Sequence, residues 1–168
     1  VRREKVQPNV YTCSAAISSC EKEGQWQEAL LLFGLVSREN IETNTVSYNA
    51  AISSCEKGCQ WKEAVSLFNS MPAGEIPQDV VSCSAVISSF EKLFEWQHAI
   101  QVLQFMPKAF VHPNEFSFSA AISSAEKGSQ LHVALDLFEA MPKAFVQPSV
   151  VAYNATISAC EKAGQWQA

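Results

Sequence analysis

Several patterns are missing from this sequence of 168 residues, and each absence excludes a class of protein. No apolar run approaches the roughly 18 uninterrupted residues that a membrane-spanning helix requires. Nothing resembles a cleavable signal peptide, so a reducing compartment explains the six cysteines better than secretion does. Strict alternation of apolar and polar residues over about four to eight positions is also absent, which argues against β-strands.

The composition indicates an ordered protein with a weak negative charge. Apolar residues make up 48% of the chain and charged residues 17%, so enough hydrophobic surface is present to exclude wholesale disorder. The net charge is −5 and the pI about 5.2, whereas nucleic-acid-binding domains are generally basic. The chain begins with Val1 and stops within a recurring phrase, so we expect a longer protein, with targeting sequences outside this window.

The sequence repeats itself every 35 residues without slippage, as the spacing of Ile17, Ile52 and Ile87 illustrates. Intervals of this size are typical of solenoids, in which each repeat is one supersecondary unit. We divide the chain into four complete units and a truncated fifth: 10–44, 45–79, 80–114, 115–149 and 150–168.

Each unit is predicted to form two helices. In the second unit an apolar stripe that begins at Val46 includes Tyr48, Ala51 and Cys55, whose spacings are three and four, and a second stripe runs from Trp61 to Met71. Glycines that tolerate a left-handed backbone are expected to end the first helices: Gly24, Gly58, Gly128 and Gly164. Prolines are expected to close the second helices: Pro72, Pro107 and Pro142.

One such hairpin cannot bury both of its apolar faces, so neighbouring units must stack and share a continuous core. The predicted fold class is therefore all-α: an α-solenoid of stacked helical hairpins. A tryptophan opens the second helix of most units, where packing explains it better than ligand stacking does. These residues are Trp26, Trp61, Trp96 and Trp166.

Two phrases, 46–52 (VSYNAAI) and 151–157 (VAYNATI), followed by Lys, Gly, Ala, Leu-Phe and Met at fixed offsets, resemble the pentatricopeptide repeat. The similar tetratricopeptide repeat has about 34 residues and a tryptophan, glycine and tyrosine in its first helix, and these units lack that set. The resemblance implies a right-handed superhelix that binds single-stranded RNA, with one base per repeat, in mitochondria or plastids.

The resemblance also implies which side chains read the base edges. One lies in the first helix of each unit: Ser14, Asn49, Ser84, Ser119 and Asn154. Its partner is the last residue of the unit: Asn44, Asp79, Asn114 and Ser149. All of them are small hydrogen-bonding types, as edge reading requires. Ser with Asn implies adenine and Asn with Asp implies uracil, so units one to three imply adenine, uracil, adenine. The alternative is structural, because Ser and Asn near a helix start often bond free backbone donors.

Two further rows are implied to contact RNA. Residues that would sandwich each base are Tyr11, Val46, Val81, Phe116 and Val151. Residues that would approach the phosphates are Lys22, Lys57, Lys92, Lys127 and Lys162. A plain solvated surface explains the lysines equally well. Because adjacent residues lie about 100° apart around a helix, we expect the preceding glutamates to turn away and leave the lysine side positive.

No catalytic constellation or phosphate-cradling glycine loop is recognisable, so the sequence predicts no enzymatic activity, no cofactor and no small-molecule substrate. The cysteines mostly occupy apolar rows, and the only close pair, Cys55 and Cys59, has no nearby histidine to complete a zinc site. Two functions remain: an RNA-binding adaptor of organellar RNA processing, stability, editing or translation, and a protein-interaction scaffold or accessory subunit of an organellar complex. The acidic charge and the small number of units favour the second.

Overall fold

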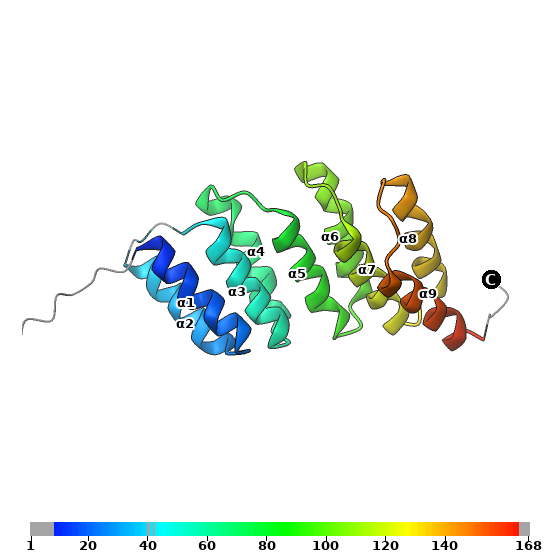
Figure 1. The fold of residues 1–168 in the computed structure, drawn as a ribbon, viewed down its shortest axis with the longest axis horizontal. Helices are drawn as coiled ribbons and strands as arrows, with labels where there is room; N and C mark the ends of the chain where they lie inside the picture. The colour runs from blue at the N-terminus through cyan, green and yellow to red at the C-terminus, as the bar shows by residue number, and fades with distance from the viewer. Residues whose placement is uncertain (1–8, 40, 42, 165–168) are drawn as a thin grey trace, which may run out of the picture.

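The computed structural model describes residues 9–39, 41 and 43–164, and within them it contains helices and no strands. The first helices of the units are α1 (Val10–Lys22), α3 (Thr45–Lys57), α5 (Val80–Glu91), α7 (Glu115–Lys127) and α9 (Val150–Lys162). The second helices are α2 (Trp26–Arg38), α4 (Trp61–Ser70), α6 (Trp96–Phe105) and α8 (Leu131–Lys143). The helix pairs follow one another along an elongated array (Figure 1). The predicted α-solenoid is confirmed.

Each first helix begins at a polar side chain that caps it. The Asn9 side chain accepts a hydrogen bond from the Thr12 backbone amide at 2.9 Å, which satisfies a donor that the helix leaves free. The same role falls to the last residue of each unit, 35 residues apart: Asn44, Asp79, Asn114 and Ser149. The residue that ends one unit therefore fixes the start of the next.

First helices form one layer and second helices the other. Each internal first helix contacts the first helices on both sides and the second helices of its own and the preceding unit. Between the layers lies one continuous core that includes Ile52, Ile87 and Met106, all with no exposed surface. Truncation of such a side chain to alanine typically destabilises a protein by about 2–5 kcal/mol.

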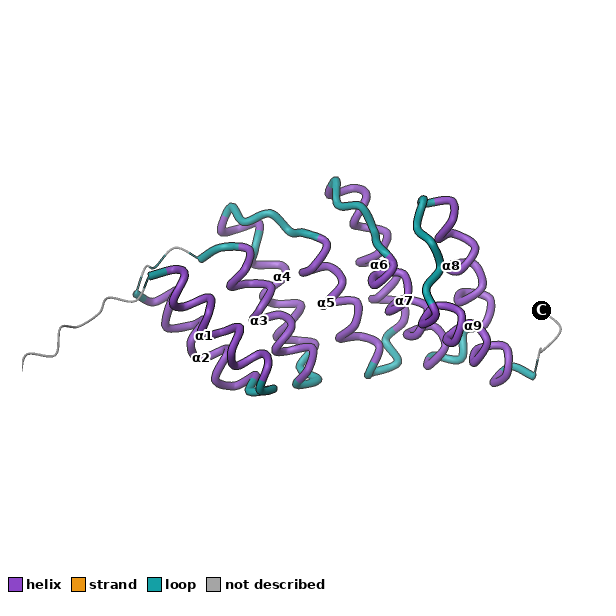
Figure 2. The backbone as a smooth tube through the Cα atoms, in the orientation of Figure 1, coloured by secondary structure: helices purple, strands orange, loops and turns teal. Residues whose placement is uncertain are grey.

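Short turns within the units lie along one edge of the array, and the longer links between units lie along the other (Figure 2). Two of the second helices are followed by 3-10 turns that contain a proline, η1 (Pro72–Gly74) and η2 (Met106–Ala109). The expectation that Pro142 closes its helix is wrong, because α8 runs on to Lys143. A proline in the last turn removes only one donor, and the Ala144 amide still bonds the Ala140 carbonyl at 3.0 Å.

The interpretation of the turn glycines is right for Gly24 and Gly164, which are left-handed, and wrong for Gly58 and Gly128. In those two units the left-handed residue is the next one, Cys59 with φ 57° and Ser129 with φ 56°. Gly58 and Gly128 have ordinary backbone angles.

Close packing explains these two glycines. A Cβ atom at Gly58 would clash with the Trp26 ring, and one at Gly128 would clash with the Trp96 ring. Both rings belong to the preceding unit, so these tryptophans pack between units, as the sequence indicated. Trp166 lies outside the described residues.

Candidate nucleic-acid interface

The apolar row predicted to sandwich bases lies on the outer surface of the first-helix layer, which we call the first-helix face. One residue comes from the second position of each first helix, and its exposed fraction is between 49% and 78%. The row comprises Tyr11, Val46, Val81, Phe116 and Val151. Because these side chains are outside the core, one apolar wall per unit is available to a ligand.

The edge pairs, each made of a first-helix polar residue and the last residue of its unit, come together in space. In unit two, Asn49 Nδ2 donates a hydrogen bond to Asp79 Oδ2 at 2.9 Å. In unit four, the Ser119 and Ser149 hydroxyls are 3.0 Å apart. Each pair bridges two consecutive first helices, although its members are 30 residues apart in the chain.

Unit one brings its pair together through a third side chain. Ser14 Oγ lies 3.4 Å from Asn44 Oδ1 and 2.7 Å from Ser47 Oγ, and it also bonds the Val10 carbonyl at 2.7 Å. This hydroxyl is therefore engaged within the protein. Asn154 is exposed, and its unit ends beyond the described residues.

The sequence also allowed a structural role for these polar residues, as helix caps. The last residue of each unit has that role, because its side chain caps the next first helix. Asp79 shows that capping and pairing are compatible. Its Oδ1 accepts from the Ser82 amide at 2.8 Å, while its Oδ2 accepts from Asn49. Because a carboxylate only accepts, Asp79 must face the amino group of Asn49, which leaves Asn49 Oδ1 as an acceptor.

Two polar atoms of the edge row have no hydrogen-bond partner among the described residues although they are buried. They are Asn49 Oδ1 and Ser84 Oγ. Buried polar groups are nearly always satisfied, and an unsatisfied one costs about 1–3 kcal/mol. Where such an atom belongs to a residue that lines a cavity, as Ser84 does, a ligand can supply the missing partner.

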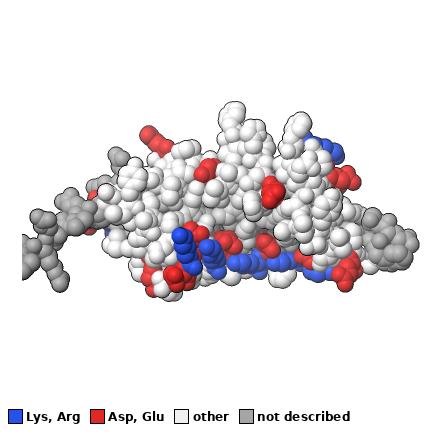
Figure 3. All heavy atoms as spheres, viewed as in Figure 1, with Lys and Arg blue, Asp and Glu red and all other residues white. Residues whose placement is uncertain are grey.

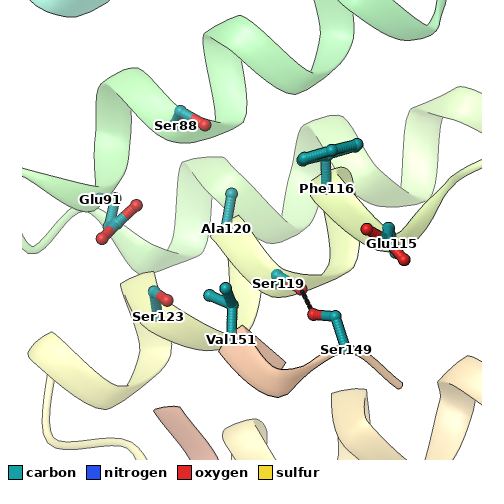
Figure 4. A pocket seen from close by; sticks show the side chains of 9 residues that line it. All are labelled: Ser88, Glu91, Glu115, Phe116, Ser119, Ala120, Ser123, Ser149 and Val151. Atoms are coloured by element: carbon teal, nitrogen blue, oxygen red, sulfur yellow. Dashed lines mark hydrogen bonds between the residues drawn. The ribbon is translucent and has the colours of Figure 1, made fainter. Parts of the chain in front are cut away.

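Two cavities lie between successive members of the apolar row. The first, of about 290 Å³, has Val81 and Phe116 as walls and contains Ser84 and Asn114. The second, of about 240 Å³, lies between Phe116 and Val151. Figure 4 shows the Ser119–Ser149 hydrogen bond within this second cavity. Both cavities are smaller than typical drug-sized pockets, so each suits a single planar ring system.

The predicted phosphate row follows the opposite ends of the first helices, and four of its five lysines are paired with carboxylates. Lys57 lies 3.0 Å from Glu21, and Lys127 lies 2.9 Å from Glu91. The ion pairs Lys92–Glu56 at 3.4 Å and Lys162–Glu126 at 2.6 Å continue the series. Each pair joins consecutive units, and Figure 3 shows the cations along one edge with acidic side chains beside them.

The expectation that the glutamates turn away from this side is wrong. Glu56 and Glu91 line the two cavities that also contain the edge pairs. The physical reason is the stacking of units, which places each lysine beside the glutamate of the unit before it. The angle between adjacent residues around one helix could not predict an ion pair between a lysine and a glutamate that lie 36 residues apart in neighbouring units.

Glu126 is the most buried of these carboxylates. Burial alone would raise its pKa, but hydrogen bonds from Lys162 and Ser158 and the charges of Lys162 and Lys127 outweigh burial. The pKa of Glu126 therefore lies below its ordinary value, and the carboxylate is ionised at neutral pH.

The cysteines show no sign of a reactive centre. Burial, with a smaller contribution from Glu63, raises the pKa of Cys55 to about 12, and burial raises that of Cys83 to about 11. Cys59 is exposed. Within residues 9–39, 41 and 43–164, no three His, Cys, Asp or Glu side chains cluster as metal ligands would. Nor does any described helix have the length and apolarity needed to cross a membrane.

Comparison with family models settles the relationship. A model of the pentatricopeptide repeat domain matches residues 1–57 and 122–163, and a PPR repeat model matches residues 46–74. The chain belongs to the pentatricopeptide repeat family. No curated protein matches it.

Solved structures share the fold of this pentatricopeptide repeat array. The PPR domain of Arabidopsis thaliana protein-only RNase P 1, solved with tRNA, aligns with a TM-score of 0.81 at 15% identity over 94% of this chain and 85% of that one. PPR10 in complex with an 18-nt psaJ RNA element aligns with a TM-score of 0.84 at 20% identity over 97% of this chain. The match spans 24% of the PPR10 chain. Nuclear proteinaceous RNase P 2 from A. thaliana has a TM-score of 0.81 at 12% identity, over 96% of this chain and 36% of its own.

Proposed function

We propose that this pentatricopeptide repeat array is a non-catalytic adaptor that binds single-stranded RNA, with about one base per unit. Two of the similar structures are RNA complexes, one with tRNA and one with an 18-nt RNA element. The observation that carries the proposal is the pair of buried, unpartnered atoms, Asn49 Oδ1 and Ser84 Oγ, on a face that also presents exposed apolar walls. A base supplies both a planar ring for the walls and edge groups for the polar atoms.

The edge pair of unit two supports uracil. Asn49 Oδ1 is an acceptor, because Asp79 holds the amino group of the same side chain. Uracil presents a ring N–H to such an acceptor, whereas cytosine presents a ring nitrogen that only accepts. The Ser–Asn pairs of units one and three favour adenine by the family resemblance, so the proposed register is adenine, uracil, adenine from 5′ to 3′.

Short single strands test this register directly. We expect the chain to bind RNA that contains AUA more tightly than scrambled RNA of the same composition, as measured by fluorescence anisotropy at fixed salt. Equal affinity for both strands would remove the base assignment. Failure to bind any single strand would remove the proposal as a whole.

The proposed setting is RNA metabolism in a plastid or mitochondrion: processing, stability, editing or translation. It follows from the family resemblance, and one similar structure belongs to a protein described as nuclear, so the fold by itself does not determine the compartment. Fractionation of cells that express the full-length protein, followed by crosslinking and sequencing of bound RNA, tests both parts. Recovery from the nucleus would refute the setting.

A protein-interaction scaffold is the second candidate, because the net charge is −5 and the described lysines at four of the five predicted phosphate positions are paired with glutamates. Under this function, stoichiometric protein partners would co-purify without enriched RNA.

A further inference from the structure

Every unit carries a serine one helical turn beyond its first edge residue, in a row that the edge pairs do not use. The last member, Ser158, donates a hydrogen bond to Glu126 at 2.8 Å. The row comprises Ser18, Ser53, Ser88, Ser123 and Ser158. Three of its members line the cavities: Ser53 and Ser88 the larger one, and Ser88 and Ser123 the smaller one. Each cavity thus contains two such serines, from consecutive units.

These hydroxyls are free to accept a ligand. In the part of the chain that the structure describes, Ser53, Ser88 and Ser123 are half-buried, and no hydrogen bond engages their side chains. The serines that follow them differ: Ser54 bonds the Ala50 carbonyl at 2.8 Å, and Ser89 bonds the Val86 carbonyl at 2.7 Å. The first row faces the cavities. In the second row Ser54 and Ser89 are satisfied inside the protein, whereas Ser124 is buried without a partner among the described residues.

The order of groups along α5 matches the order of groups in a nucleotide. Ser84, whose buried hydroxyl has no partner, lies at the base-edge position of the larger cavity. Ser88 follows one turn later, and Glu91 and Lys92 lie about one turn beyond that. Figure 4 shows the corresponding arrangement in the smaller cavity, with Ser88, Ser123 and Glu91 at the end away from Phe116. A sugar lies between its base and its phosphate, and this serine row lies between the edge row and the lysines.

We propose that Ser53, Ser88 and Ser123, together with the cavity carboxylates of Glu56 and Glu91, bind the ribose 2′-hydroxyl and make this face select RNA over DNA. A 2′-hydroxyl both donates and accepts, and it is the group by which proteins distinguish the two nucleic acids. Serine offers a donor and an acceptor, and a carboxylate offers acceptors, so the set is complementary to that group. This inference rests on the proposed binding of single strands and adds a sugar-specific subsite to it.

The test compares three strands of one base sequence containing adenine, uracil, adenine: RNA, its 2′-deoxy form with deoxyuridine in place of uridine, and its 2′-O-methyl form. We expect the wild-type chain to bind the RNA about tenfold more tightly than the deoxy strand, since each neutral hydrogen bond contributes modestly. In the S53A/S88A/S123A variant the ratio should fall towards one, through loss of RNA affinity with deoxy affinity retained. The O-methyl strand, which cannot donate, should bind the wild type more weakly than RNA does.

The matched control is S19A/S37A/S66A, which removes three exposed hydroxyls away from both cavities and should keep the wild-type ratio. Circular dichroism and thermal unfolding establish that both variants fold. A purely structural role for the serines would weaken RNA and deoxy binding together, and that result, or an unchanged ratio, would overturn the inference. If the wild type binds the RNA and deoxy strands equally, this inference fails while the proposed single-strand binding stands. If it binds neither, both fail.

Discussion

The edge row and the lysine row differ in what the folded protein leaves available. Both repeat every 35 residues on the same first helices, and both were predicted to contact RNA from the same family resemblance. In the structure, the edge row keeps buried atoms without partners, such as Asn49 Oδ1, while lysines such as Lys57 and Lys127 bond carboxylates of the preceding unit. Equal periodicity therefore does not imply equal availability to a ligand.

The energies of the two rows also differ. An exposed ion pair contributes about 0–1 kcal/mol, so exchange of a glutamate for a phosphate costs the fold little. A buried atom without a hydrogen bond costs about 1–3 kcal/mol, and a ligand recovers that free energy. Selectivity should thus reside in the edge row, while the lysine row sets a modest, salt-dependent contribution.

The largest expected effect comes from exchanging an edge pair. The N49S/D79N variant gives unit two the Ser–Asn pair of units one and three and should change its preference from uracil to adenine. A correct edge contact is worth about 1–3 kcal/mol, or roughly 10- to 100-fold in the ratio of affinities for AUA and AAA strands. Exchange of the exposed Asn69 for serine is the control. A ratio unchanged by the double variant would contradict the assignment.

A smaller effect should follow removal of the cations. If Lys57, Lys92 and Lys127 reach phosphates, their replacement by alanine should reduce the salt slope of single-strand binding by about 0.7 for each phosphate that the variant no longer neutralises. Titrations at several salt concentrations measure that slope. A weakened affinity with an unchanged slope would show that the lysines act through the ion pairs between units and not on the phosphates.

Removal of the competing carboxylates should act in the opposite direction. The E56Q/E91Q variant frees Lys92 and Lys127 and keeps an amide oxygen that can accept from a 2′-hydroxyl, so RNA affinity should rise a few-fold at low salt and the gain should disappear at high salt. The E28Q/E139Q variant makes the same change in net charge on the second helices. An equal gain in this control would assign the effect to net charge and not to the rows.

The smallest effect concerns acid stability. Because the folded pKa of Glu126 lies below its unfolded value, the carboxylate contributes stability above the unfolded pKa, and this is lost as pH falls through the folded pKa. The free energy of unfolding of the wild type should exceed that of E126Q at neutral pH by on the order of 1 kcal/mol. Chemical denaturation across the acid range should show the two converging. A constant difference would refute the role of ionisation.

Local rules were enough to predict the fold but not every contact that it makes. The stripes that begin at Val46 and Trp61 predicted α3 and α4, because the 3.6-residue period depends only on the chain nearby. The same reasoning misinterpreted Gly58, whose backbone is ordinary and whose missing side chain makes room for Trp26. A close approach between two units leaves no signal in the local sequence. A glycine that ends a helix therefore cannot be told from a glycine that makes room for a tryptophan ring of the neighbouring unit.

For the candidate site, too, the sequence predicted some features and the packing of units decided others. The residue types at Ser84, Asn49 and Phe116 and their spacing followed from the sequence. The bond of Asn49 to Asp79 across two helices, and the free Ser84 hydroxyl, depended on the distance between units.

The repeat itself determined that this chain forms stacked helical hairpins, because a short amphipathic pair must bury its apolar stripes against copies of itself. Tertiary structure alone decided which polar groups satisfy one another. Lys57 meets Glu21, which lies 36 residues earlier, and Asn49 meets Asp79, which lies 30 residues later. Such pairings depend on the offset between adjacent hairpins, which is set by packing of the whole array and by no single segment of it.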